Sequence, residues 1–119
     1  MAKYEYTLDG NMDDLLDRLH VDLTKGSPTA TFEDGSDYFV GETRVAVRVY
    51  ERYSMIGTVR VSLSITIVGE GRDLFLSAIT SGGSQSSFYR MLAIGEDTFL
   101  ELCAQSVENY LVQKEETQF

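Results

Sequence analysis

Two runs of alternating aliphatic residues constrain the fold of this chain more than any other feature. They lie in the segment TRVAVRVYERYSMIGTVRVSLSITIV, where aliphatic side chains hold the odd positions Val45, Val47, Val49, Val59, Val61, Leu63, Ile65 and Ile67. A period of two is typical of β-strands, whose successive side chains point to opposite faces of a sheet. The pattern predicts two long strands joined near residues 54–57, with odd positions facing the core in both. Glu51 interrupts it and indicates a bulge or a strand end.

Two segments have the period of an amphipathic helix. The first follows a candidate cap, Asn11, and ends near Gly26 and Pro28. Its apolar stripe consists of Met12, Leu15, Leu16, Leu19 and Leu23. The second is predicted to begin at Glu96 and Asp97, and its stripe consists of Phe99, Leu100, Cys103, Val107, Tyr110 and Leu111.

Three further segments are predicted to be extended. Residues 4–8 alternate like a half-buried strand, and residues 73–80 form a strand whose two faces are almost equally apolar, so its inward face stays unassigned. A short strand around Ala30 and Phe32 is followed by a turn, DGSD, at 34–37. In this turn Asp34 would bond to nearby backbone, and extended structure would resume at 38–40.

The element order predicts a single α+β domain over residues 1–119. Its antiparallel sheet has four to six strands, with both helices packed on one face and the other face open. The order β-α-β(4)-α resembles the TATA-binding-protein-like arrangement, although DNA binding does not follow from that likeness. The alternative is a helix-grip domain, whose extra strands would come from residues 29–42 and 84–94.

Charge and composition exclude several classes of function. A net charge of −9 argues against binding to nucleic acid or to anionic membranes, because both need a dominant positive field. The first residues lack the pattern of an export signal, and no apolar run approaches the ~20 residues that span a bilayer. Cys103 is the only cysteine, which fits a reducing compartment. We therefore expect a soluble cytoplasmic protein without metal or cofactor.

Positive charge is concentrated in one segment. Residues 43–68 hold four arginines, Arg44, Arg48, Arg52 and Arg60, against one glutamate. Because these are even positions, all four are expected on the open face, where they could bind an anionic small molecule or an acidic protein segment. Two alternatives remain, a solvated face whose arginines contact acidic groups of the same chain, and a homodimer surface. The anion hypothesis fails if Arg44, Arg48 and Arg60 are fully paired within the chain.

The stretch AITSGGSQSSFYR, residues 78–90, is a second candidate site. It lacks the lysine of a phosphate-binding P-loop and the final glycine of a serine-nucleophile elbow. It is most simply a connection, but Gly82 and Gly83 could form a backbone nest for an anion, beside Ser84 and Arg90. The alternative function is a small enzyme that uses loop 81–90 together with an acid such as Asp37. His20 is expected to be a boundary residue of the first helix rather than a catalytic base.

Four segments together resemble a known family. They are FEDGSDYFVGE, AVRVYERYS, RVSLSITI and AITSGGSQ, and the resemblance extends over nearly the whole chain. The family is an uncharacterised one of small bacterial proteins, found mostly in Firmicutes and described only as a domain of unknown function. The resemblance implies a cytoplasmic bacterial protein and transfers no catalytic residue. The function expected from the residues is therefore a non-catalytic binding or protein-interaction module.

Overall fold

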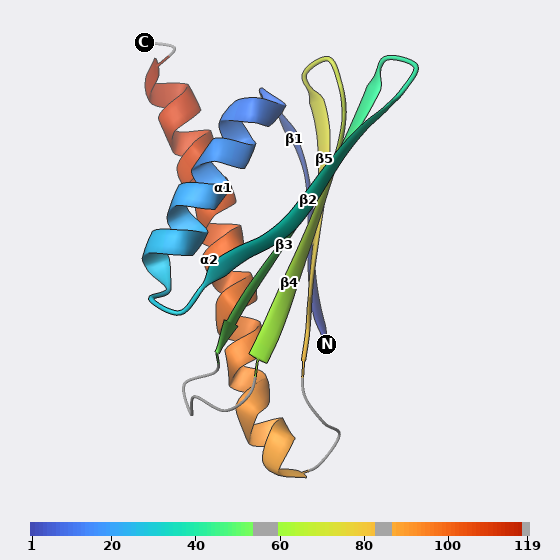
Figure 1. Ribbon diagram of the computed structural model, residues 1–119. Coiled ribbons are helices and arrows are strands. Elements are labelled where there is room, and N and C mark those ends of the chain that lie inside the picture. The colour runs from blue at the N-terminus through green and yellow to red at the C-terminus, as the bar shows by residue number, and fades with distance from the viewer. Residues whose placement is uncertain (54–59, 83–86, 118–119) are drawn as a thin grey trace.

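A five-stranded antiparallel sheet in the order β1-β5-β4-β3-β2 forms one layer, and two helices cover one of its faces (Figure 1). The computed structural model describes the backbone of residues 1–53, 60–82 and 87–117, and the side chains of residues 1–53, 60–82 and 98–115. The elements are β1 (Ala2–Asp9), α1 (Met12–Gly26), β2 (Thr31–Val40), β3 (Thr43–Tyr53), β4 (Arg60–Glu70), β5 (Asp73–Ser81) and α2 (Ser87–Thr117). The predicted α+β class and the β-α-β(4)-α order are confirmed. The junction expected near 54–57 lies outside the described residues.

Local sequence signals account for the start of α1 and for two of the turns. The Asn11 side chain accepts a hydrogen bond from the Asp14 backbone N–H at 3.0 Å, so Asn11 caps α1 as predicted. Gly41 and Gly71 each have a φ of 60° and open the two-residue turns of the β2–β3 and β4–β5 hairpins. Glycine at the first central position is the requirement of a type II′ turn, because other residues avoid that φ.

The core lies between the helices and the inner face of the sheet. In β4 the odd positions Val61, Leu63, Ile65 and Ile67 are buried, as predicted. In β5, which lies between β1 and β4, the even positions Leu74, Leu76, Ala78 and Thr80 are buried. The structure therefore assigns the inward face of this strand, which the sequence alone could not. From α2, the core receives Phe99, Cys103, Val107 and Tyr110, and from α1 it receives the predicted stripe. Burying such side chains contributes roughly 1.5–3 kcal/mol each.

The predicted inward face of β3 is wrong. Tyr50 lies opposite Leu63, and Arg48 lies opposite Ile65, in the β3–β4 ladder. Residues directly opposite each other in a ladder share a face, so the even positions of β3 lie on the helix-covered side with the odd positions of β4. The alternation alone could not reveal this, because the register between the two strands decides whether the odd positions of β3 share a face with the odd or the even positions of β4.

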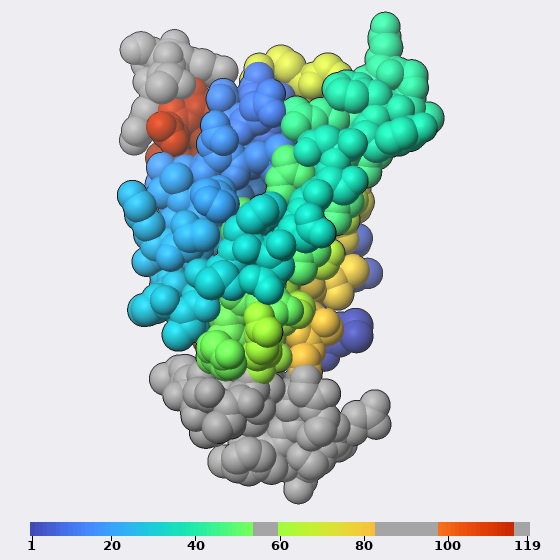
Figure 2. Space-filling model, viewed as in Figure 1, coloured from blue at the N-terminus to red at the C-terminus, as the bar shows by residue number. Residues whose placement is uncertain are grey.

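Residues 31–40 form one strand, so the prediction of a turn at 34–37 is wrong (Figure 1). In Figure 2 the atoms of this strand form a diagonal band that begins beside α1 and ends at the upper right. The ladder with β3 supplies the backbone hydrogen bonds that a turn would otherwise make, and it shifts by one residue between Phe32 and Asp34. The bulge or strand end expected at Glu51 is wrong, because β3 continues through Glu51 to Tyr53 and the irregularity lies in β2. The expected local bond of Asp34 is present, since its carboxylate accepts from the Gly35 backbone N–H at 2.7 Å.

The second helix begins at Ser87 rather than near Glu96. Gly95 lies inside it, and a glycine within a helix costs about 1 kcal/mol relative to alanine, so local propensity placed the start too late. Residues 87–94 are helical, which contradicts the extra strand that the helix-grip alternative required in that segment.

Candidate functional site

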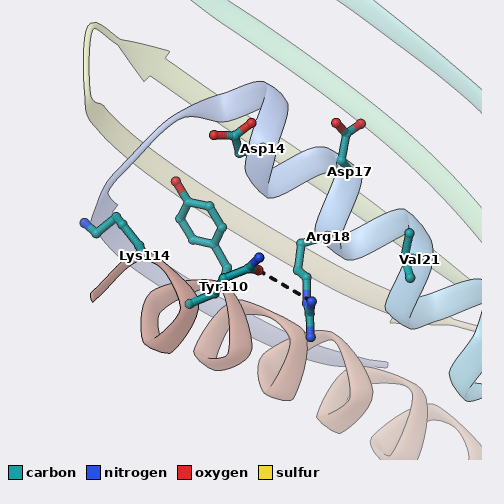
Figure 3. Close-up of a pocket in the computed structure, with 7 residues that line it drawn as sticks. Asp14, Asp17, Arg18, Val21, Tyr110 and Lys114 are labelled. Atoms are coloured by element: carbon teal, nitrogen blue, oxygen red, sulfur yellow. Dashed lines mark hydrogen bonds between the residues drawn. The ribbon is translucent and has the colours of Figure 1, made fainter. Parts of the chain in front are cut away.

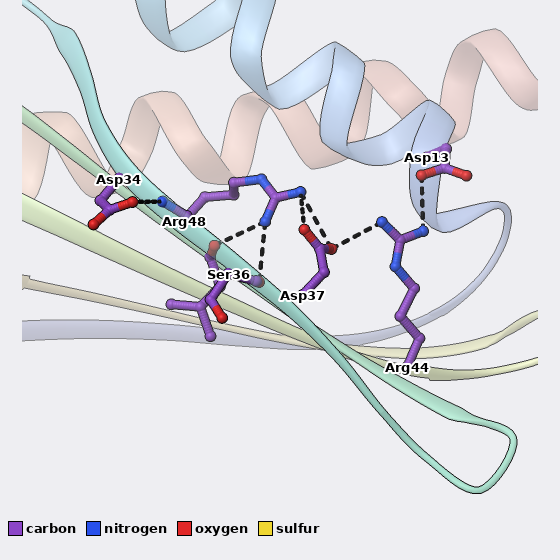
Figure 4. A network of polar contacts seen from close by, with 8 residues as sticks. Asp13, Asp34, Ser36, Asp37, Arg44 and Arg48 are labelled. Atoms are coloured by element: carbon purple, nitrogen blue, oxygen red, sulfur yellow. Dashed lines mark hydrogen bonds and ion pairs between the residues drawn. The ribbon is translucent and has the colours of Figure 1, made fainter.

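Two arginines of β3 meet one carboxylate of β2 on the helix-covered side (Figure 4). Asp37 accepts from Arg44 Nη2 at 2.9 Å and from Arg48 Nη2 at 3.0 Å. Arg44 Nη1 also donates to Asp13 of α1 at 2.8 Å, so the network joins α1 to the hairpin. Hydrogen bonding to Arg44, and then to Arg48, lowers the pKa of Asp37.

The charges of this network cancel. Arg44 and Arg48 are balanced by Asp13 and Asp37, and Arg48 Nη1 is further bonded to the carbonyl oxygens of Ser36 and Val47, at 3.2 and 2.8 Å. The hydrogen bonds to Asp13 and Asp37 raise the pKa of Arg44. Both guanidinium groups are therefore already occupied by partners in the same chain.

The other two predicted arginines lie elsewhere. Arg60 is on the open face and pairs with Glu33 at 3.3 Å and with Glu51. Arg52 is half-buried on the covered side, where its guanidinium stacks 4.6 Å from the centre of the Phe99 ring and bonds to hydroxyls of Ser27 and Thr98. Burial lowers the pKa of Arg52.

The prediction that four arginines share the open face is therefore wrong. Arg44, Arg48 and Arg52 lie on the opposite side of the sheet, because β3 pairs even positions with odd ones. Arg44, Arg48 and Arg60 are all paired within the chain, which was the condition under which the open-face anion hypothesis fails. Their ion pairs connect different elements: Arg44 and Arg48 connect β3 to β2, Arg44 also connects β3 to α1, and Arg60 connects β4 to β2.

A pocket of about 210 Å³ lies on the covered side, in the seam between α1 and the β2–β3 hairpin. Its walls are formed by Asp13, Leu16, Asp17 and His20 of α1 and by Phe32, Arg48 and Tyr50 of the hairpin. We call it the seam pocket. Three of its rings are in contact, with centroids 5.5–6.0 Å apart, and sequence reasoning missed the cluster because its members come from three elements.

The Tyr50 hydroxyl anchors this ring cluster. It lies 2.9 Å from His20 Nδ1, while the rest of the Tyr50 side chain is buried. Burial raises the pKa of Tyr50 to about 12, so the phenol stays neutral at ordinary pH. His20 is exposed on α1 beside the buried stripe, as expected of a boundary residue.

A larger groove, of about 450 Å³, lies between α1 and α2 (Figure 3). Its cationic side chains have partners in the chain: Arg18 bonds to Asp22 at 3.0 Å, and Lys114 pairs with Asp9 at 3.2 Å. Tyr110, between the helices, accepts a hydrogen bond from the Asn11 backbone N–H at 2.8 Å. The Arg18–Asp22 pair lies within α1, whereas the Tyr110 and Lys114 contacts join α2 to the segment just before α1.

The glycine-serine stretch is only partly within the described residues. A Cβ on Gly82 would lie 2.5 Å from the carbonyl oxygen of Arg60, so a close approach of two backbones requires glycine there. Gly83 and Ser84 lie outside the described residues. Arg90 lies in α2 rather than in a loop, and its side chain is also outside them. The anion nest and the loop enzyme both stay predictions.

The open face of the sheet carries an apolar row that runs across four strands. The register places Tyr38 opposite Val45, Val45 opposite Val68, and Val68 opposite Phe75. Tyr38 and Phe75 are 68% and 40% exposed. We call these four residues the apolar row. Sequence reasoning missed it because the valines of β3 were assigned to the core.

The neighbouring rows of the open face are uncharged in the middle and charged at the margins. Next to the apolar row, Ser36, Val47, Thr66 and Ser77 lie across the sheet in register. The following row places Val49 opposite Ser64 and Ser64 opposite Ile79. Charged side chains lie outside this centre, on the edge strands and at the end of the sheet that holds Glu51 and Arg60.

Comparison with known proteins identifies a family for this chain. No curated protein matches the chain. Within the described residues, neither helix has the length and apolar character needed to cross a membrane. A model described as a family of unknown function, DUF6054, matches residues 1–111. This match covers nearly the whole chain, as the resemblance of the four segments implied, and the protein therefore belongs to the DUF6054 family of unknown function.

Proposed function

We propose that the protein is a non-catalytic protein-interaction module and that a second copy of the chain docks on the open face of its sheet. The apolar row carries this proposal. Tyr38 and Phe75 are large apolar residues left in solvent on the same face as three valines of β3, and such a concentration on one surface is typical of an interaction site. Scattered single residues would not carry the same weight.

The arrangement of charge supports a protein partner. The centre of the open face consists of valines, hydroxyl residues and Phe75, whereas Lys3, Glu5, Glu51 and Arg60 lie at its margins. Interfaces have the same anatomy, a charge-depleted centre within a polar rim. In a chain with a net charge of −9, an uncharged centre also lets two copies approach without direct repulsion there.

The size of the face is sufficient for a dimer. Five strands of 8–11 residues spaced ~4.8 Å apart cover roughly 24 by 30 Å, about 700 Å². Two such faces would bury about 1,400 Å², which lies within the ~1,200–2,000 Å² of standard stable interfaces. Two sheets packed in this way would form a sandwich about 10 Å thick between the sheets.

An anionic ligand or an acidic protein segment is less well supported on this face. Arg60, at the start of β4, is a cation on the open face, and its guanidinium is already paired with Glu33 and Glu51. Acidic residues also line the edge strands, so an acidic partner would meet like charge. No observation on the described residues favours catalysis over binding.

The experiment is a mass measurement by light scattering across protein concentrations, with Val68→Asp as the test variant. The wild type is expected to be a dimer, and Val68→Asp a monomer, because the new carboxylate lies in the middle of the apolar row. Val112→Asp is the matched control. Val112 is 54% exposed on α2, which covers the opposite face of the sheet, so this variant should stay dimeric. A monomeric wild type, or a dimeric Val68→Asp variant with unchanged circular dichroism, would refute the proposal.

A further inference from the structure

The seam pocket holds a carboxylate that the chain leaves without a partner. Among the described residues, the Asp17 carboxylate makes no hydrogen bond or ion pair. The other charges around the pocket are balanced, because Arg44 lies between Asp13 and Asp37 and Arg48 is bonded to Asp37. The pocket therefore has a net negative charge, and that charge is on Asp17.

Aromatic rings line the same pocket as this carboxylate. Phe32 of β2 is 45% exposed, although it makes edge contacts with the rings of His20 and Tyr50. The ring faces of phenylalanine and tyrosine carry negative potential and attract cations. A site that combines aromatic faces, a carboxylate and the aliphatic Leu16 is suited to a cation that also has an apolar part.

We propose that the seam pocket binds a compact organic cation, a primary ammonium or guanidinium group on a short apolar stem. The stem would lie against Leu16 and Phe32, and the cationic group would bind Asp17. A volume of about 210 Å³ is below the roughly 300–1,000 Å³ of pockets for drug-sized ligands. The ligand is therefore a small molecule.

This site is independent of the proposed dimer. The seam pocket lies on the helix-covered side of the sheet, whereas the apolar row lies on the open side. Binding of a cation would therefore persist in the monomeric Val68→Asp variant. The two proposals can fail separately.

The probe is n-butylammonium, added to isotope-labelled protein while amide chemical shifts are recorded. Saturable shifts are expected for residues around the seam pocket, among them Asp17, His20 and Phe32. Asp17→Asn should weaken binding about fivefold, as expected for the loss of one partly exposed ion pair. Phe32→Leu, which keeps an apolar side chain but removes the ring, should also weaken it.

Asp14→Asn is the matched control. It removes the same charge from the same helix, but Asp14 lines only the groove between the helices, whereas Asp17 lines both that groove and the seam pocket, so binding in the groove would be weakened by both variants. Asp14→Asn should leave the affinity unchanged. Absence of saturable shifts with n-butylammonium would overturn the proposal, and so would equal weakening by Asp14→Asn and Asp17→Asn, which indicates general charge attraction. Equally strong binding of n-butanol would overturn the role of the cation.

Discussion

Arg48 lies directly opposite Ile65 in the β3–β4 ladder, although one side chain is charged and the other is fully buried. Both point to the helix-covered side. The Arg48 stem crosses this side toward the edge strand, where its guanidinium reaches Asp37 at 3.0 Å. This pairing explains how a strand next to the sheet edge can hold arginines on its inner side, and it removes them from the open face.

The Asp37 contacts should make stability depend on acid pH. The pKa of Asp37 is lowered in the folded chain from its ordinary value of 3.8, so its contribution is present above that value and is lost as the pH falls below it. Asp37→Asn should reduce the free energy of unfolding by about 1 kcal/mol at neutral pH, a modest figure because the side chain is 41% exposed. Below the folded-state pKa of Asp37 the difference between wild type and variant should shrink.

Urea unfolding at a series of pH values measures this dependence. Asp17→Asn is the control, since the Asp17 carboxylate has no partner among the described residues, and it should change the free energy of unfolding by less than about 0.5 kcal/mol. A loss from Asp37→Asn that is the same at neutral and acid pH would contradict the assigned ion pairs.

Cys103 should be unreactive in the folded protein. Its side chain is fully buried among core residues, and burial raises the pKa of the thiol to about 12, so almost no thiolate is present at neutral pH. A chromogenic disulfide reagent should label it only as the chain unfolds in urea. The fully denatured chain, which should give one thiol, is the control; rapid complete labelling in native buffer would show that α2 is not packed as described.

Gly82→Ala should destabilise the end of the sheet. The new Cβ would lie 2.5 Å from the Arg60 carbonyl oxygen, which belongs to backbone and cannot rotate away. Overpacking of this kind costs roughly 1–3 kcal/mol, measured as the free energy of unfolding in urea. Ser81→Ala, one residue earlier, should cost less than about 0.5 kcal/mol. Equal stability of the two variants would exclude the close approach of the two backbones.

Patterns within single elements were sufficient to predict much of the fold. The cap at Asn11, the stripe of α1 and the buried odd positions of β4 were confirmed, because capping and side-chain period depend on a few neighbouring residues. The helical start at Ser87 and the unbroken β2 were missed. In β2 the ladder with β3 overrode local propensity, since a ladder partner can stabilise a glycine-containing segment, whereas α2 simply continues through Gly95.

The candidate sites depended on how the elements pair and pack against one another, which no pattern within a single element reveals. The sequence by itself determined that β3 has one valine face and one arginine face, because alternation is a property of the strand. Only the tertiary structure decided which face is open, since the register pairs Arg48 with Ile65 and thereby turns the valines outward. The seam pocket was likewise decided by tertiary structure, because helix and hairpin residues far apart in the chain meet there only when α1 packs beside the β2–β3 hairpin.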